Sequence, residues 1–555
     1  MKNFFLKKKG NYIIFFIILI FLNSIVFSET AAISADAPLA VKVGEKILKS
    51  GGNAIDAAVA IGFAMAVTFP QAGNIGGGGF MIVKLKDKKP IFIDYRETAP
   101  KNFKLSAFFN NGKFDRKKST IGYLASGVPG TVKGFYKAWK LGGSLPWKKL
   151  IEPAIKLAEE GFIIRPYLAR SFKRHYKVLE RFSDTKRIFL NFGKYYLAGD
   201  RLIQPELAQT LRLIAEKGPD GFYKGETADK IEKDFREHGG WITKKDLIEY
   251  KAIIRKPIIV NFKGYKFIMP TLPSSGGPVI AEILNMLKEF KIPEDDFGYY
   301  NLLAEIFKLS FYDRSFYMGD SDFNKIPIKA FLSEDYAREK AKLIKLGKIY
   351  KIDKKEIPDP FKYEGKDTTH FSIIDRFGNA VSNTYTLNSI FGSGVIVKGS
   401  GIIMNNEIDD FGFGEKNANQ FGLITSDFNL ARAGKRMLSS MSPTIVLKDG
   451  KPFIISGAAG GPKIITSTIQ IILNIILRGK SLKEAVQAPR IHHQCFPNIL
   501  LVSKQMKEEV IRKLENLGYK IIKVRYIAVA NSVLVMADKT YAQSDSGHFG
   551  IGVVF

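Results

Sequence analysis

The chain has 555 residues, of which 46% are hydrophobic and 25% are charged, and these proportions are typical of a globular protein with a large core. The formal net charge of +30 would suit a nucleic-acid-binding protein, but the lysines are scattered and form no basic stripe. We therefore expect a solvated basic surface, which leaves attraction to anionic membranes open, and no nucleic-acid partner. The single cysteine, Cys495, excludes an intramolecular disulfide and a cysteine-rich metal site, and the six histidines show no metal-ligand spacing.

The N-terminal residues are typical of a secretory signal peptide. Lysines at positions 2 and 7–9 precede the apolar stretch 12–22, and Val26-Phe27-Ser28 provides acceptable residues before a cleavage site. The apolar run is shorter than the ~20 residues that a membrane span requires. We therefore predict a signal peptide over residues 1–28 and export to the periplasm or the medium, with an uncleaved membrane anchor as the less favoured alternative.

From Ala32 onward the pattern is that of an α/β protein. A helix is predicted over Pro38–Lys49, between an initial proline and a pair of glycines, and a buried helix over Asn53–Val67, which is apolar nearly all round. The glycine-rich stretch 71–85 leads into a strand. It contains no GxxxxGK[ST] sequence and no GxGxxG between a strand and a helix, so we predict close packing of backbone layers there rather than a phosphate site.

An apolar strand over residues 91–95 ends at Arg96, which has Asp94 and Glu97 near it in the sequence. Acids on either side can hold a guanidinium rigid, and the planar guanidinium fork pairs bidentately with carboxylates. Taken alone, these residues favour a surface ion pair over a binding site.

Residues 140–365 are predicted to be mainly helical. The segment 348–367 is rich in lysine, aspartate and proline, and we predict an exposed, mobile stretch there. The predicted helices are 147–160, 205–217, 226–238, 278–290, 299–318 and 333–346.

The stretch from Asp367 to Asn388 predicts a hairpin of two strands around the turn 376–379. Thr368 stands at its head. A threonine hydroxyl is a poor nucleophile at neutral pH and needs an adjacent base. An α-amine, with a pKa of about 7.7–8, supplies that base on the same residue once the preceding peptide bond is cut. Three motifs follow: NNEIDDFG at 405–412, KRMLSSMSPT at 435–444 and GAAGGP at 457–462.

This series of motifs, together with DYRE at 94–97, resembles the γ-glutamyltranspeptidase family over almost everything after the first thirty residues. The resemblance implies an α/β (α+β) fold, a four-layer αββα sandwich of the N-terminal nucleophile hydrolase type. It also implies self-cleavage between Asp367 and Thr368. The products would be a large subunit, residues 29–367, and a small subunit, residues 368–555, which stay together as an intertwined heterodimer. No metal or other cofactor is implied.

The resemblance also implies a role for each motif residue. Thr368 would be the nucleophile, Thr386 would orient its hydroxyl, and Gly460 and Gly461 would supply backbone N–H groups to the oxyanion. The α-amine of a γ-glutamyl donor would bind Asn388, Glu407 and Asp410. The α-carboxylate would bind Arg96, Ser439 and Ser440.

The implied activity is transfer of the γ-glutamyl group of glutathione or a related amide to water, an amino acid or a dipeptide. A cephalosporin or glutaryl acylase and a polyglutamate transferase on the same scaffold are alternatives. Glu407 and Asp410 argue against the acylase. A non-enzymatic surface adhesin would explain export and basic charge, but not this order of motifs.

The loop Gly412–Asp427 should form a lid over the site. It carries Phe421 where relatives often have a tyrosine whose hydroxyl can tether the loop. Because phenylalanine has no hydroxyl, we predict that residues 415–419 of the lid are mobile.

If Thr368 attacks the Asp367 carbonyl, the purified protein should give two bands on a denaturing gel, and the smaller chain should begin at Thr368. Thr368→Ala should leave one uncut chain without activity, and Thr368→Ser should be cut more slowly. N-terminal sequencing of the smaller chain is the measurement. A different new N-terminus, or activity in the uncut alanine variant, would contradict the assignment.

Overall fold

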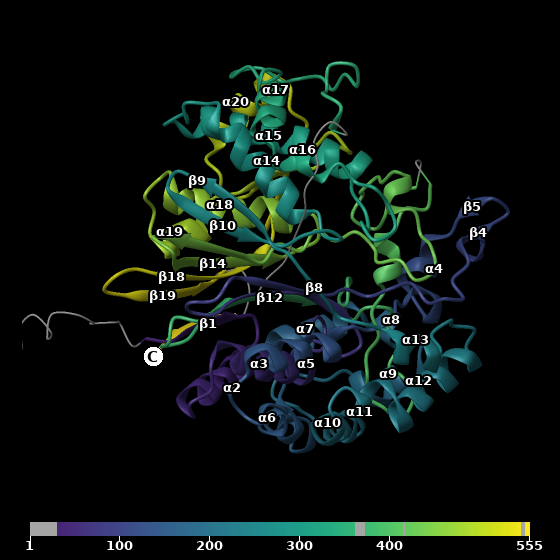
Figure 1. The fold of residues 1–555 in the computed structure, drawn as a ribbon. Helices are drawn as coiled ribbons and strands as arrows, with labels where there is room; N and C mark the ends of the chain where they lie inside the picture. Colours follow the sequence, from purple (N-terminus) through teal and green to yellow (C-terminus); the bar gives the residue numbers. More distant parts are fainter. Residues whose placement is uncertain (1–29, 361–371, 415–416, 546–549) are drawn as a thin grey trace, which may run out of the picture.

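The computed structural model describes residues 30–360, 372–414, 417–545 and 550–555 (Figure 1). Within these ranges no helix combines the length and the apolar character needed to cross a membrane. The predicted signal peptide and the predicted cleavage site, Asp367 and Thr368, lie outside the described residues.

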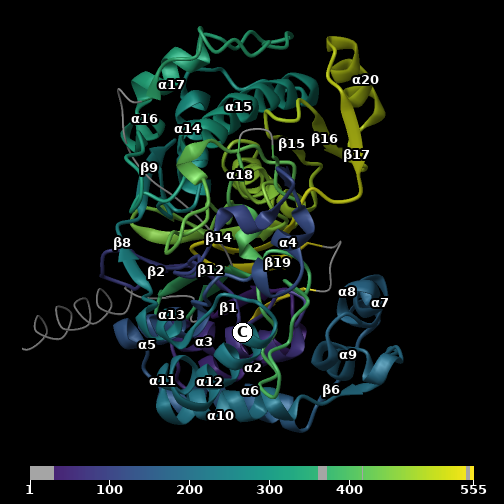
Figure 2. The ribbon, with the colours of Figure 1, turned by 90° about the vertical axis from the view of Figure 1, so that its right-hand side faces the viewer.

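Two antiparallel sheets lie face to face in the centre of the molecule, and helices cover both outer faces (Figures 1 and 2). This arrangement confirms the predicted four-layer αββα sandwich. In spatial order, the seven-stranded sheet contains β20 (Ile551–Val554), β1 (Ala32–Ala35), β11 (Ser372–Ile374), β12 (Ala380–Thr386), β2 (Gly78–Lys84), β3 (Ile91–Tyr95) and β8 (Ile253–Arg255). The six-stranded sheet contains β19 (Thr540–Ser544), β18 (Val529–Val535), β14 (Lys451–Ala459), β13 (Thr444–Lys448), β10 (Tyr265–Met269) and β9 (Ile258–Phe262).

One helical layer packs on the seven-stranded sheet and the other on the six-stranded sheet (Figure 1). The first layer includes α2 (Pro38–Lys49), α3 (Ala54–Thr68), α5 (Thr131–Gly142), α6 (Trp147–Glu159), α10 (Pro205–Lys217) and α12 (Gly225–Glu237). The second includes α14 (Gly276–Lys288), α15 (Asp296–Tyr317), α17 (Glu334–Ala341), α18 (Lys463–Ile476), α19 (Leu482–Gln487) and α20 (Glu508–Leu517).

The alternation of side chains along the central strands gives the sandwich two cores. On β2, Met81 and Val83 pack against the helices of the first layer, whereas Phe80 and Ile82 pack between the two sheets. Successive residues of a strand point to opposite faces, so a strand that is covered on both faces is apolar throughout. The sheets are therefore held in place by apolar burial on each side.

Most predicted helices agree with the structure to within a few residues, and α2 and α10 agree at both ends. The structure differs most over residues 253–269, a region predicted to be mainly helical, where β8, β9 and β10 form instead. Strands β9 and β10 make a tight hairpin through Lys263 (φ 50°) and Gly264 (φ 81°). Two successive positive φ angles suit a two-residue turn, and glycine adopts them without strain.

The glycine-rich stretch before β2 packs backbone against backbone, as predicted. A Cβ atom added to Gly77 would lie 2.1 Å from the carbonyl oxygen of Thr386, and one added to Gly76 would lie 2.2 Å from that of Ile403. Only glycine allows an approach this close. The stretch therefore fixes the end of β12 and the segment that leads to residues 405–410.

Candidate active site

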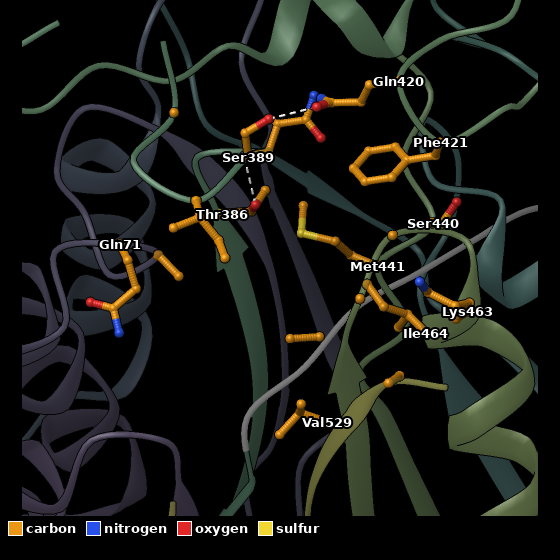
Figure 3. Close-up of a pocket in the computed structure, with 18 of the residues that line it drawn as sticks. Gln71, Thr386, Ser389, Gln420, Phe421, Ser440, Met441, Lys463, Ile464 and Val529 are labelled. Atoms are coloured by element: carbon orange, nitrogen blue, oxygen red, sulfur yellow. Dashed lines mark hydrogen bonds between the residues drawn. The ribbon is translucent and has the colours of Figure 1, made fainter. Parts of the chain in front are cut away.

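A cavity of about 820 Å³ opens where the ends of β12 and β14 face each other (Figure 3). Six of the residues predicted for the site line it: Thr386, Asn388, Asp410, Ser440, Gly460 and Gly461. Three more, Arg96, Glu407 and Ser439, are almost fully buried and do not line it. Thr368 lies outside the described residues. The structure thus brings together motifs that are widely separated in the sequence.

The turn after β12 places Thr386 and Asn388 at the cavity. The Thr386 hydroxyl accepts a hydrogen bond from the backbone N–H of Asn388 (2.7 Å), and the Asn388 amide donates to the carbonyl of Asn406 (3.1 Å). Asn388 has a φ of 74°, a left-handed conformation that asparagine tolerates better than most residues. The turn is therefore fixed by its own side chains and by the segment of Asn406.

Gly460 and Gly461 form the turn between β14 and α18. Their φ angles are 148° and 62°, which side-chain-bearing residues rarely adopt. A Cβ atom on Gly461 would lie 2.9 Å from the ring of Phe421. Glycine is thus required here by conformation at both positions and by space at Gly461.

The guanidinium of Arg96 is completely buried among three carboxylates. Its Nη1 lies 2.6 Å from Glu407 and 3.5 Å from Glu97, and its Nη2 lies 2.6 Å from Asp410. Its Nε donates to the carbonyl of Met437 (3.2 Å). In this structure Arg96 therefore contacts the acids predicted for the donor's amine, and Asp410 stands between it and the cavity.

The Arg96 cluster carries more acids than bases, and this shifts its proton equilibria. Burial raises the pKa of Glu97 to about 7, although the charge of Arg96 opposes the shift. Burial also raises the pKa of Glu407 well above its usual range and raises that of Asp410. The acids in turn raise the pKa of Arg96, which stays charged. The cluster is therefore suited to accept an additional cation at Asp410, its cavity-lining member.

Ser439 and Ser440 of the 435–444 motif lie beside the loop that precedes α14. The hydroxyl of Ser275 donates to the carbonyl of Ser439 (2.7 Å). Arg314, on α15, donates from Nη2 to the Ser440 hydroxyl (2.8 Å) and from Nε to the Ser275 hydroxyl (2.9 Å). Sequence reasoning named Glu97 only as a neighbour that can hold Arg96, and it missed Ser275 and Arg314 as parts of the site. The PSSGGP sequence at 273–278 was a signal for such a supporting loop.

The lid makes several hydrogen bonds over its described residues. Residues 415 and 416 of the segment predicted to be mobile lie outside the described residues, and the mobility stays a prediction. The Ser389 hydroxyl donates to the Gln420 side chain (2.7 Å), and Gln494 donates to the Phe421 carbonyl (3.2 Å). Arg116 donates to the carbonyl of Ala418 (2.7 Å). The contact between Ser389 and Gln420 joins the lid to the segment that follows β12 (Figure 3), so this tether does not depend on a hydroxyl at position 421.

Comparison with solved structures identifies the fold class. A cephalosporin acylase from Bacillus halodurans matches with a TM-score of 0.84 and 26% identity, covering 95% of this chain and 96% of that one. A γ-glutamyltranspeptidase from Helicobacter pylori matches with a TM-score of 0.57 and 39% identity, covering 59% of this chain and 95% of that one. The fold is that of the N-terminal nucleophile hydrolases.

The family follows from sequence comparison. The gamma-glutamyltranspeptidase family model matches residues 40–553. The glutathione hydrolase proenzyme of Escherichia coli K12 is 43% identical over 518 residues, covering 92% of this chain and 89% of the relative. That of Bacillus subtilis 168 is 41% identical, covering 87% of this chain and 84% of the relative. The chain belongs to the γ-glutamyltranspeptidase family, a family of enzymes, which confirms the resemblance.

The raised pKa of Glu97 predicts a pH-dependent loss of stability. The native carboxyl holds its proton up to about pH 7, whereas the unfolded one releases it near 4.5, so the native state is favoured below pH 4.5 and progressively less as the pH rises to 7. Glu97→Gln should flatten the decline of Tm between pH 4.5 and 7.5. The exposed Glu216→Gln serves as a control that leaves it unchanged. Parallel Tm curves for wild type and Glu97→Gln would contradict this prediction.

The tether between Ser389 and Gln420 predicts a lid that opens when the hydroxyl is removed. A neutral hydrogen bond contributes about 0.5–1.5 kcal/mol, so Ser389→Ala should raise the open fraction of the lid roughly two- to tenfold. Limited proteolysis within residues 412–427 measures this fraction. Phe421→Tyr should change the nicking rate much less, because the tether is already present. An unchanged rate in Ser389→Ala would show that other contacts hold the lid.

Proposed function

We propose that this chain is a self-processing γ-glutamyltransferase and glutathione hydrolase, with Thr368 as nucleophile. The observation that carries the proposal is the register of the hairpin: Ser372 on β11 pairs with Ser382 on β12, and β12 ends at Thr386 in the cavity. Thr368 is four residues before the first residue of β11 in the sequence. The strand that pairs with β11 therefore carries Thr386, the residue predicted to orient the nucleophile.

The chemistry then follows from the groups around the cavity. The α-amine of Thr368 would take the proton of its own hydroxyl, which attacks the γ-carbonyl of the donor. The backbone N–H groups of Gly460 and Gly461 would stabilise the tetrahedral oxyanion, each such donor contributing roughly 2.7–4 kcal/mol in known enzymes. The α-ammonium of Thr368 would then give this proton to the nitrogen of the scissile amide. The C–N bond breaks, that nitrogen leaves as an amine, and the γ-glutamyl group remains as an ester on Thr368. Water or an acceptor amine then releases the γ-glutamyl group.

The donor's α-amino acid end would lie between two oppositely charged parts of the wall. The ammonium would bind Asp410, with Glu407 and Asn388 beside it, because this part of the wall carries the excess of acids. The carboxylate would bind the hydroxyls of Ser439 and Ser440, and the planar guanidinium of Arg96 would lie behind these serines. Glutathione is the proposed donor, in keeping with the names of the relatives.

An acylase is the second candidate, because the chain resembles the Bacillus halodurans cephalosporin acylase over 95% of its length. A polyglutamate transferase is a third. A glutaryl side chain lacks the α-amine, so an acylase that acts on glutaryl substrates needs no acids to bind an ammonium. The contacts of Glu407 and Asp410 therefore favour the γ-glutamyl donor.

Cleavage before Thr368 would give residues 29–367 and 368–555 as a heterodimer that cannot come apart without unfolding. Both sheets contain strands from both parts: β11, β12 and β20 lie in the first sheet beside β1 and β2, and β13 and β14 lie in the second beside β9 and β10. The term proenzyme in the names of relatives supports such processing. The predicted signal peptide supports export to the periplasm or the medium.

The test is hydrolysis of γ-glutamyl-p-nitroanilide and glutaryl-p-nitroanilide, each with and without glycylglycine. We expect cleavage of the γ-glutamyl substrate, stimulated by the acceptor. Preference for the glutaryl substrate would favour the acylase, and no cleavage of either would contradict the proposal.

Asp410→Ala should discriminate between these two substrates. It removes a charged contact to the amine, an interaction of about 1.5–3 kcal/mol, so kcat/KM for the γ-glutamyl substrate should fall roughly ten- to hundredfold. The glutaryl substrate has no amine and should lose much less. Equal losses on both substrates would show that Asp410 holds Arg96 in place and does not contact the amine of the substrate.

A further inference from the structure

Arg314 is a buried cation without an ion-pair partner among the described residues. It lies near the end of α15 and is 2% exposed. Its Nε and Nη2 donate to the hydroxyls of Ser275 and Ser440, and its Nη1 has no hydrogen-bond partner in the described part of the chain. Burial lowers its pKa to about 10, and Asp410 is the acid whose charge opposes this shift.

Other buried cations of the described chain are compensated by acids or, in the case of Lys435, by the backbone carbonyls of Phe428 and Leu430. Arg96 contacts three carboxylates, Lys340 contacts Glu282 and Asp313, and Arg490 pairs with Asp545. Burying a charge is costly unless an opposite charge or several hydrogen bonds compensate it. An uncompensated guanidinium therefore indicates that an anion completes its environment when the enzyme is at work.

The place of that anion follows from the hydrogen bonds. The Ser440 hydroxyl accepts from Arg314, so its own proton is free to be donated into the cavity, which Ser440 lines. The Ser275 hydroxyl accepts from Arg314 and donates to the Ser439 carbonyl, which fixes the neighbouring residue. Arg314 thus orients the hydroxyls of Ser275 and Ser440. Its charge also strengthens the Ser440 hydroxyl as a hydrogen-bond donor.

We propose that Arg314 is a positioning residue for the donor's α-carboxylate: it holds Ser439 and Ser440 as an anion site and supplies the positive charge that the carboxylate neutralises through Ser440. The assignment rests on the proposed γ-glutamyl donor. Three carboxyl groups surround the single guanidinium of Arg96, so the electrostatic potential of this cluster does not by itself favour an anion beside Ser439 and Ser440. Arg314 restores a positive potential on the serine side while Asp410 keeps the amine side negative.

Three small ligands separate the two sides: L-glutamate carries both α-groups, glutarate lacks the amine, and 4-aminobutyrate lacks the α-carboxylate. Their affinities for the processed protein are measured by calorimetry and as inhibition constants. Arg314→Met should weaken L-glutamate and glutarate about tenfold or more and leave 4-aminobutyrate within about twofold. It should also raise KM for γ-glutamyl-p-nitroanilide more than it lowers kcat. Asp410→Ala should weaken L-glutamate and 4-aminobutyrate instead.

The matched control is Arg478→Met. Arg478 pairs with Asp296 at the other end of α15 and does not line the cavity, so the three affinities should not change. Arg314→Lys keeps the charge but not the planar fork, and it should recover part of the glutarate affinity. If Arg314→Met does not fold, wild type is compared with Arg314→Lys, where a loss confined to L-glutamate and glutarate supports the assignment.

Equal weakening of all three ligands by the Arg314 variants, or no weakening at all, overturns the assignment. A different result would contradict the proposed function: the wild-type protein would neither cleave γ-glutamyl-p-nitroanilide nor bind L-glutamate more tightly than glutarate. The two outcomes can be distinguished. Failure of the proposed function is measured on the wild-type protein alone, whereas failure of the Arg314 assignment is measured from how the variants change the affinities for the three ligands relative to one another.

Discussion

The buried guanidinium of Arg96 is the interaction on which the arrangement of the site depends. It joins the end of β3 to the 3₁₀ helix Glu407–Asp410 and, through the Met437 carbonyl, to the segment that carries Ser439 and Ser440. Removing one partner of a buried ion pair typically costs 3–5 kcal/mol, because a charge is then left uncompensated. Arg96 therefore fixes the relative positions of both motif segments, whatever it contributes to binding.

This constraint divides the charges of the site into two parts. Three carboxyl groups lie around Arg96, and their pKa values are raised because burial disfavours so many negative charges in one place. On the serine side the buried charge is the guanidinium of Arg314, which no acid of the described residues pairs with. Asp410 and Ser440 are the members of each part that line the cavity. A ligand end with one positive and one negative group matches this division better than a simple carboxylate does.

The sequence predicts the elements better than the contacts between them. Helix α2 was predicted at both ends because proline and glycine mark them and its apolar periodicity is regular. The β9–β10 hairpin was missed because it lies in a region whose other segments have helical periodicity. The meeting of Arg96 with Glu407 joins residues more than three hundred positions apart, which no local pattern encodes. The family resemblance placed both residues at the substrate site but did not predict that they contact each other. Arg314, which local sequence cannot distinguish from a surface charge on a helix, was not expected at all.

The order of strands explains how a chain of this fold could be cut near its middle and remain one molecule. Strand β11, which follows the proposed cleavage site, lies between β1 and β12 and pairs with both. Strand β1 precedes the cut and also pairs with β20, the last strand of the chain. Breaking the peptide bond before Thr368 would remove none of these ladders. The cut would release a new chain end at the head of β11 while the hydrogen bonds and apolar contacts of the strand stay in place. The residues of β11 that follow the cut would therefore stay fixed between β1 and β12.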